Sequence, residues 1–387
     1  MKKYSIKIVI YIMLFMLIFT GQMSLVWANP FDVEARSAIL MDPVSGKVIY
    51  EKNPNDKLPP ASVTKIMTML IAMEEIDSGN IALTDKVTIS EHASSMGGSQ
   101  LYMEPGEIRT VEELMKGIAV ASANDGCVAM AEFISGSEEV FVKRMNDKAR
   151  ELGMNNTQFM NTNGLPEEGH YTTAYDIALM SKELLKHPKI HKWLTIWMDT
   201  LTVGLPNKKQ TVLQLTNTNK LIRFYKGANG IKTGYTSDAK YCLSASAKKN
   251  GFNLIAVILG SPTSKIRFAE ASKMLNYGFS NYSMVNVAKK NQVMGEIKVD
   301  KGKVENINVI AKDNVGTIVK KGQEKEVHKE IVIQKSIKAP LKAGSKVGYI
   351  SLSLNGKEIT KIDLVAEKDV KKANVLDIFT RLSDNVL

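Results

Sequence analysis

The chain has 387 residues, of which 44% are apolar and 24% are charged, so it is long enough for two domains with substantial cores. This composition excludes collagen-like, coiled-coil and disordered proteins. The formal net charge of +11 is compatible with attraction to anionic lipid or acidic polymers, and equally with plain solubility.

The N-terminus has the layout of a secretory signal peptide. Three lysines precede an apolar run over residues 8–19, and Ala28 supplies the small residue at which such peptides are cut. This run is short for a membrane span, which needs roughly 20 residues. We expect residues 1–28 to be removed on export, with an uncleaved membrane anchor as the alternative. An exported protein does not meet nucleic acid, so no nucleic-acid partner is expected.

The cysteines and histidines give no sign of a metal site. Cys127 and Cys242 are the two cysteines, and neither lies in a spacing typical of metal or redox centres. Their apolar neighbours favour two buried free thiols over a disulfide. His187 and His191 are four residues apart, but Pro188 between them disrupts a regular helical pair. We therefore predict no metal and no cofactor.

The first half of the mature chain is predicted to form a hairpin followed by helices. Residues 38–52 hold two apolar segments around a turn-rich joint at 42–46. Apolar residues at helical spacing predict a helix over 62–76. A capping box at 110–113 opens another helix, and a further helix is expected near 125–134.

The second half is predicted to contain more strands. Residues 241–247 and 253–259 flank Asn250-Gly251, which is a strong hairpin signal. A helix is expected over 262–279. Short alternating strands follow, so residues 281–372 are predicted to form a separate all-β domain.

Three short motifs appear in a defined order. Residues 62–65 fit Ser-x-x-Lys, residues 122–124 fit Ser-x-Asn, and residues 232–234 are Lys-Thr-Gly. This set is typical of class A β-lactamases and penicillin-binding proteins. Each motif alone is weak, because residues 246–249 and 383–385 fit the first two patterns as well. Order and setting separate them, since the chosen serines open or precede predicted helices.

The spacing within the motifs makes chemical sense. Ser62 and Lys65 are three residues apart and share one helical face. A serine hydroxyl needs a base, and Lys65 can serve if desolvation and the charge of Lys232 lower its pKa. Ser122 can relay a proton to a leaving amine, and Asn124 can hold the substrate amide or Lys65. Ser62 alone would equally fit a helix N-cap.

These residues resemble the low-molecular-weight penicillin-binding proteins of the serine-type D-alanyl-D-alanine carboxypeptidase family. The likeness covers nearly the whole mature chain. Beyond the motifs it is carried by Asp42-Pro43, Gly98–Leu101, Asn163–Leu165, Thr173–Asp176, Lys265–Phe268 and Tyr277–Phe279. The resemblance implies an α/β fold of the β-lactamase/transpeptidase type over residues 29–280, in which helices flank a five-stranded antiparallel sheet. A C-terminal β-sandwich domain over 281–372 would follow.

The resemblance also implies roles for individual residues. Ser62 would form the acyl-enzyme, and Lys65 would be its base. Ser122, Asn124 and Lys232 would complete the site. Thr233 and Arg267 would bind the carboxylate of the terminal D-alanine, since a guanidinium forks onto a carboxylate. The alternative for Arg267 is a surface ion pair. Gly234 would let a substrate backbone approach its strand, and the backbone N–H of Tyr235 would share an oxyanion hole with that of Ser62.

The implied reaction removes the terminal D-alanine from the pentapeptide stems of peptidoglycan, and β-lactams would acylate the same serine. Three other functions stay open. A β-lactamase needs a carboxylate for deacylation, and residues 151–155 fit its Glu-x-x-x-Asn pattern, although Gly153 is expected to end a helix there. A D,D-endopeptidase hardly differs in sequence. A penicillin sensor without turnover usually has a long membrane segment with a signalling partner, and neither is visible.

The C-terminal tail over residues 373–387 is amphipathic. Its apolar residues fall on one helical face, and Lys368, Lys371 and Lys372 lie just before it. The apolar residues are Val375, Ile378, Phe379, Leu382 and Val386. We expect an interfacial helix that holds the exported enzyme on the outer face of the cytoplasmic membrane or at the cell wall. The alternatives are a short helix packed on the β-domain and a frayed end.

Overall fold

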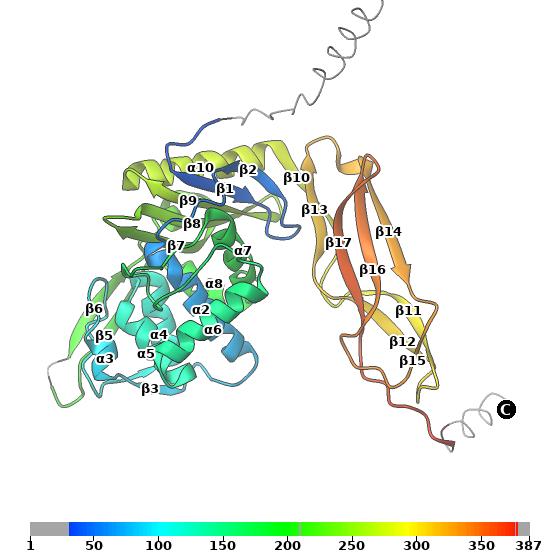
Figure 1. Cartoon of the computed structure of the whole chain (residues 1–387), viewed down its shortest axis with the longest axis horizontal. Coiled ribbons are helices and arrows are strands. Elements are labelled where there is room, and N and C mark those ends of the chain that lie inside the picture. The colour runs from blue at the N-terminus through cyan, green and yellow to red at the C-terminus, as the bar shows by residue number, and fades with distance from the viewer. Residues whose placement is uncertain (1–30, 209, 376, 378–387) are drawn as a thin grey trace, which may run out of the picture. The chain divides into compact units, whose positions relative to one another are not determined.

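The computed structural model describes residues 31–208, 210–375 and 377 (Figure 1). The expected signal peptide over 1–28, and all but four residues of the expected amphipathic tail, lie outside these described residues. Within the described part of the chain, no helix combines the length and the apolar character needed to cross a membrane.

A five-stranded antiparallel sheet forms the centre of the N-terminal domain, with strand order β2-β1-β9-β8-β7. Its strands are β1 (Ser37–Met41), β2 (Val48–Lys52), β7 (Ala228–Thr236), β8 (Lys240–Lys249) and β9 (Phe252–Ser261). The predicted hairpins at 38–52 and around Asn250-Gly251 are both present. Strand β7 is an edge strand, because it pairs with β8 alone among the described strands.

Helices cover both faces of this sheet. Figure 1 shows α10 (Ser264–Asn281) on one face and the helices α2 to α8 on the other, while the short α9 lies beside α10. Those helices are α2 (Lys65–Asp77), α3 (Glu91–Ser94), α4 (Val111–Lys116), α5 (Asn124–Ser135), α6 (Glu138–Glu151), α7 (Ala174–Leu184), α8 (His191–Leu194) and α9 (Leu221–Phe224), with 3₁₀ turns at Ala61–Thr64 and Pro188–Ile190 and a π-helical segment at Gly117–Ala121. Because both faces are covered, β9 is buried along nearly its whole length and β8 along its six central residues.

Local sequence explains where the helices near the site begin. The predicted capping box is present, with the Thr110 hydroxyl accepting from the backbone of Glu113 and the Glu113 carboxylate accepting in return. Helix α2 buries ten of its thirteen residues, so it runs through the core and needs no polar face.

Cys127 and Cys242 are buried free thiols, as predicted.

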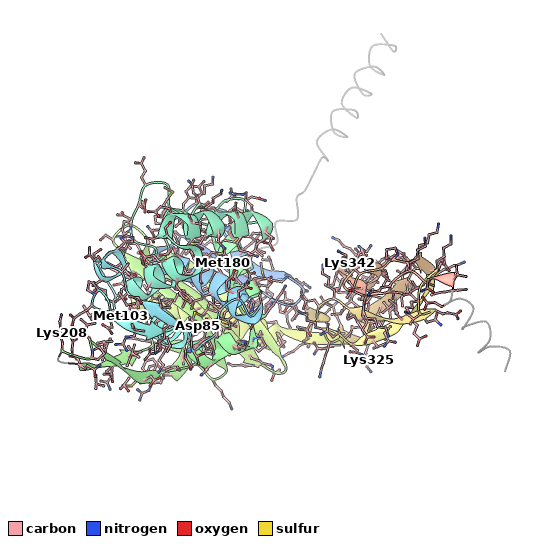
Figure 2. The ribbon with its side chains drawn as sticks, turned by 90° about the horizontal axis from the view of Figure 1, so that it is seen from below. Asp85, Met103, Met180, Lys208, Lys325 and Lys342 are labelled. Carbon is pink, nitrogen blue, oxygen red and sulfur yellow. The ribbon has the colours of Figure 1, made fainter. Side chains whose placement is uncertain are left out.

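Two small antiparallel pairs complete the N-terminal domain. They are β3 (Lys86–Thr88) with β4 (Ile108–Thr110), and β5 (Met198–Val203) with β6 (Thr211–Thr216). Lys208, labelled in Figure 2, lies in the loop between β5 and β6.

The C-terminal domain is all β with its own apolar core. Helix α10 ends at Asn281, and the first strand of this domain starts at the next residue. A two-stranded sheet joins β10 (Tyr282–Ala288) and β13 (Val315–Lys320). A six-stranded sheet holds β14 (Val327–Ile333), β16 (Lys346–Leu354), β17 (Lys357–Ala366), β12 (Asn306–Ala311), β11 (Val293–Asp300) and β15 (Ser336–Lys338), in that order. The predicted fold class is confirmed.

Candidate active site

The first motif lies where a 3₁₀ turn runs into helix α2. Ser62 is in the turn Ala61–Thr64, and Lys65 is the first residue of α2. Side chains three residues apart in a 3₁₀ turn eclipse one another, and Lys65 Nζ lies 3.0 Å from Ser62 Oγ. Ala61 adopts a positive φ of 48°, which is uncommon outside glycine and typical of strained functional turns.

The amine of Lys65 is fully buried and has three polar neighbours. Besides Ser62 Oγ, it lies 2.6 Å from Asn124 Oδ1 and 2.5 Å from the backbone oxygen of Asn163. Both of these oxygens are acceptors only. In the neutral amine they engage its two N–H bonds, so the lone pair is left facing the serine hydroxyl. This geometry allows Lys65 to take the proton of Ser62.

Burial makes the Lys65 amine easier to deprotonate than an ordinary lysine. Burial lowers the pKa of Lys65 to about 8, although Cys127 and Asp125 act in the opposite direction. At that pKa roughly a tenth of the amine is neutral at pH 7. Burial, followed by the charge of Lys65, lowers the pKa of Lys232 well below its usual value. From the sequence, we expected desolvation and the charge of Lys232 to lower the pKa of Lys65 together, and desolvation is the main cause.

The second motif follows a local distortion of the helix. The π-helical segment Gly117–Ala121 ends at Ser122, which is buried and left-handed with a φ of 64°. π-bulges and left-handed non-glycine residues both concentrate at functional sites. The Ser122 hydroxyl has no hydrogen-bond partner among the described residues. Asn124 Nδ2 donates to Gly97 O at 2.6 Å, so the amide that holds Lys65 is itself fixed.

The third motif lies on edge strand β7, beside the nucleophile. A Cβ at Gly234 would lie 3.0 Å from Ser62 N and Pro60 O, which is tighter than ordinary van der Waals contact, so glycine favours this close approach. Lys232 is buried and its Nζ donates to Thr233 O at 3.0 Å, while Thr233 Oγ1 lies 2.6 Å from Thr218 Oγ1. The neighbouring Tyr235 is 56% exposed.

Arg267 reaches β7 from helix α10 on the far side of the sheet. Its Nη1 donates to Gly234 O at 3.0 Å and to Cys242 O at 2.9 Å, so one nitrogen ties β7 to β8. The residue is 6% exposed, which rules out the surface ion pair considered from the sequence. Contact with a substrate carboxylate stays a prediction.

Sequence reasoning missed several groups around the site. The Asn163 carbonyl is a backbone atom with no sequence signature. The carboxylate of Asp125 accepts the backbone N–H of Leu101 at 2.9 Å and holds the loop beside Asn124. His170, one of the histidines set aside from the sequence, is buried and bonds to Thr64 within the first motif. His170 lies outside the three motifs, so their spacing does not reveal its contact with Thr64.

A cavity of about 360 Å³ opens beside the serine. Its walls include Ala61 next to Ser62, the segment from Gly164 to Glu168, and Thr236 at the end of β7. The cavity therefore lies between the turn that carries Ser62, the segment from Gly164 to His170 and the C-terminal end of β7.

Comparison with known proteins agrees with this arrangement. Residues 24–263 match the family described as D-alanyl-D-alanine carboxypeptidase, and residues 282–372 match the penicillin-binding protein 5 C-terminal domain. The chain belongs to the D-alanyl-D-alanine carboxypeptidase family. It is 49% identical over 349 residues to D-alanyl-D-alanine carboxypeptidase DacF of Bacillus subtilis (strain 168), covering 90% of this chain and 89% of that relative.

Two further similarities extend over the same length. D-alanyl-D-alanine carboxypeptidase DacC of Escherichia coli (strain K12) is 35% identical over 367 residues, which cover 92% of this chain and 88% of the relative. The solved penicillin-binding protein 5 from Haemophilus influenzae superposes with a TM-score of 0.71 at 31% identity, covering 89% of this chain and all of that one. The predicted family is confirmed, and with it a serine peptidase acting on the cell wall.

Proposed function

We propose that the enzyme removes the terminal D-alanine from peptidoglycan pentapeptide stems through an acyl-enzyme on Ser62. The observation that carries this assignment is the 3.0 Å approach of Lys65 Nζ to Ser62 Oγ, with two other acceptors holding the remaining N–H bonds. Burial keeps part of the amine neutral near pH 7.

Acylation begins when Ser62 Oγ passes its proton to Lys65 and attacks the carbonyl of the penultimate D-alanine. The backbone N–H groups of Ser62 and Tyr235 stabilise the oxyanion. The carbon–nitrogen bond to the terminal D-alanine then breaks, and Ser122 relays the proton from Lys65 to the leaving amine. Water hydrolyses the ester, with Lys65 acting again as base, and restores the free serine.

Substrate binding uses the exposed edge of β7. An extended peptide can add to an unpaired strand edge through backbone hydrogen bonds, and Gly234 lets the turn that carries Ser62 lie close against this strand. Lys232 and Thr233 meet the terminal carboxylate, with Arg267 behind them. The acyl part of the substrate runs toward Thr236 and the cavity there.

The structure gives no support to β-lactamase turnover. Glu151, the residue that fits the deacylation pattern, is the last residue of α6. Its carboxylate pairs with Lys148 at 2.7 Å, and its side chain is 66% exposed. β-Lactams are therefore proposed as slowly released inhibitors that acylate Ser62. Cleavage of cross-links by the same chemistry stays the second candidate, because β7 leaves its edge open to longer peptides.

The location is also a proposal. The basic and apolar N-terminus supports export, and the apolar stripe over 373–387 supports attachment to the outer face of the membrane.

The decisive experiment follows D-alanine release from a synthetic pentapeptide ending in D-Ala-D-Ala. Wild-type enzyme should release one D-alanine per peptide and carry a penicillin adduct on the peptide containing Ser62. Ser62→Ala should lose both activities, whereas Ser246→Ala, in the competing Ser-x-x-Lys string, should keep them. An adduct on any peptide lacking Ser62 would overturn the assignment.

A further inference from the structure

The segment from Asn161 to His170 lies over the start of helix α2. It contacts two successive turns of that helix, because Lys65 Nζ donates to Asn163 O at 2.5 Å and Thr68 Oγ1 donates to Thr162 O at 2.6 Å. One of these carbonyls is part of the environment of the proposed base. A shift of the segment would therefore change the direction in which the Lys65 amine points.

The imidazole of His170 joins this segment to the first motif. Its Nε2 lies 2.9 Å from Thr64 Oγ1, and the backbone N–H of Met160 donates to its Nδ1 at 3.3 Å. Because Nδ1 accepts, the neutral ring carries its hydrogen on Nε2 and donates to Thr64. Phe159 packs edge-on at 5.9 Å and fixes the plane of the ring.

The ring stays uncharged under working conditions. Burial, followed by the charge of Lys65, lowers the pKa of His170 to about 4. A neutral ring can bond Thr64 without adding a second positive charge beside the amine of Lys65. His170 is thus suited to hold a position and not to exchange protons with substrate.

The segment packs closely against the 3₁₀ turn around this bond. Gly164, between Asn163 and the cavity, has a φ of +86°, and a Cβ there would lie 1.9 Å from Ala61 O and 2.8 Å from Thr64 Oγ1. The segment and the 3₁₀ turn that carries the nucleophile are therefore in direct contact.

We propose that His170 is a positioning residue for acylation, which bonds Thr64 and thereby holds the Asn163 carbonyl against the Lys65 amine. Without this bond the segment can shift, and the amine loses one of the two acceptors that aim its lone pair at Ser62. The inference rests on the proposed role of Lys65 as base. It assigns a role to a histidine that lines the cavity beside the serine and bonds Thr64 within the first motif.

The test removes each side of the bond in the full-length enzyme. His170→Phe and Thr64→Val keep approximate size but lose the donor and the acceptor. Each should lower the maximal rate of acylation by a fluorescent penicillin by at least about tenfold, with the half-saturating concentration changed less than about twofold. The double variant should be no slower than the slower single variant, because both remove one interaction.

Two further variants separate positioning from simple loss of structure. His170→Gln keeps an N–H donor at similar reach and should recover much of the rate. His187→Phe, at the other end of α2 where the ring pairs with Asp77 at 2.7 Å, should acylate at the wild-type rate. Thermal unfolding of every variant reports the folded fraction, and Thr64→Val carries the test if His170→Phe does not fold.

The inference is overturned if His170→Phe acylates normally, if the single effects multiply in the double variant, or if glutamine gives no recovery in a folded protein. Failure of the proposed function looks different. In that case the wild-type enzyme itself carries its penicillin adduct away from Ser62, or Lys65→Arg acylates normally.

Discussion

Lys65 combines a buried amine with two neutral acceptors, and this combination decides its chemistry. An ammonium would satisfy all three neighbours, but desolvation disfavours the charged form. Asn124 and Asn163 solvate the amine without a negative charge, so they do not restore its usual pKa. A carboxylate at either place would raise the pKa of the amine, so less of it would be neutral and able to accept a proton at pH 7.

The rate of penicillin acylation should therefore depend on pH with a single limb set by Lys65. Because the neutral amine is the active form, the rate should rise about tenfold per pH unit below a pKa of about 8 and level off above it. Lys65→Arg should lower the rate at least about 100-fold at every pH, since guanidinium stays protonated. A flat profile between pH 6 and 9 in the wild-type enzyme would contradict this role.

Gly164 offers a second test at single-residue scale. Gly164→Ala places a Cβ 1.9 Å from the carbonyl oxygen of Ala61 and should displace the turn that carries Ser62. Acylation should fall steeply and stability by more than about 1 kcal/mol. Gly169→Ala is the matched control, since its φ is +82° but its nearest neighbour lies at 3.7 Å. Equal effects of the two changes on acylation would show that backbone strain alone is responsible.

At the scale of elements, the sequence pattern predicted those features that short local motifs determine. Asn250-Gly251 predicted its hairpin because few other residues fit such a turn, and the capping box at Thr110 marked a helix start. The π-helical segment before Ser122 was not predicted, because tertiary packing selects it. The contact between Asn163 and Lys65 joins residues 98 positions apart through a backbone atom, so no spacing rule reveals it.

Arg267 links strands β7 and β8 and is also a proposed carboxylate-binding residue. Arg267→Ala leaves two strand carbonyls without their donor, and the free energy of unfolding should fall by about 1–3 kcal/mol. Lys265→Ala, on the exposed face of the same helix, should change it by less than about 0.5 kcal/mol. If Arg267 also supports the carboxylate site, turnover of a free-acid substrate should fall more than that of its C-terminal amide. Equal loss on both substrates would leave only the structural role.

At the scale of the whole molecule, every proposed catalytic and binding residue lies between Ser62 and Arg267, before the β-domain begins. The β-domain and the tail are thus not needed for the proposed chemistry, and their role can be to hold the enzyme in place. Val375, at the start of the tail, is 81% exposed, so its side chain is largely open to solvent. This exposure agrees with the apolar stripe of the tail sequence.

Deletion of residues 374–387 should release the exported enzyme from membranes without loss of carboxypeptidase activity. The stripe supplies apolar burial, whereas Lys368, Lys371 and Lys372 add about 1 kcal/mol each on anionic lipid. Salt should therefore weaken vesicle binding only modestly, and Phe379→Glu should weaken it more than Lys371→Glu. Sedimentation with vesicles and D-alanine release measure the two properties separately. If the truncated enzyme with its signal peptide removed still sediments with membranes, attachment must come from the β-domain. Strands β14 and β16 of that domain carry exposed lysines.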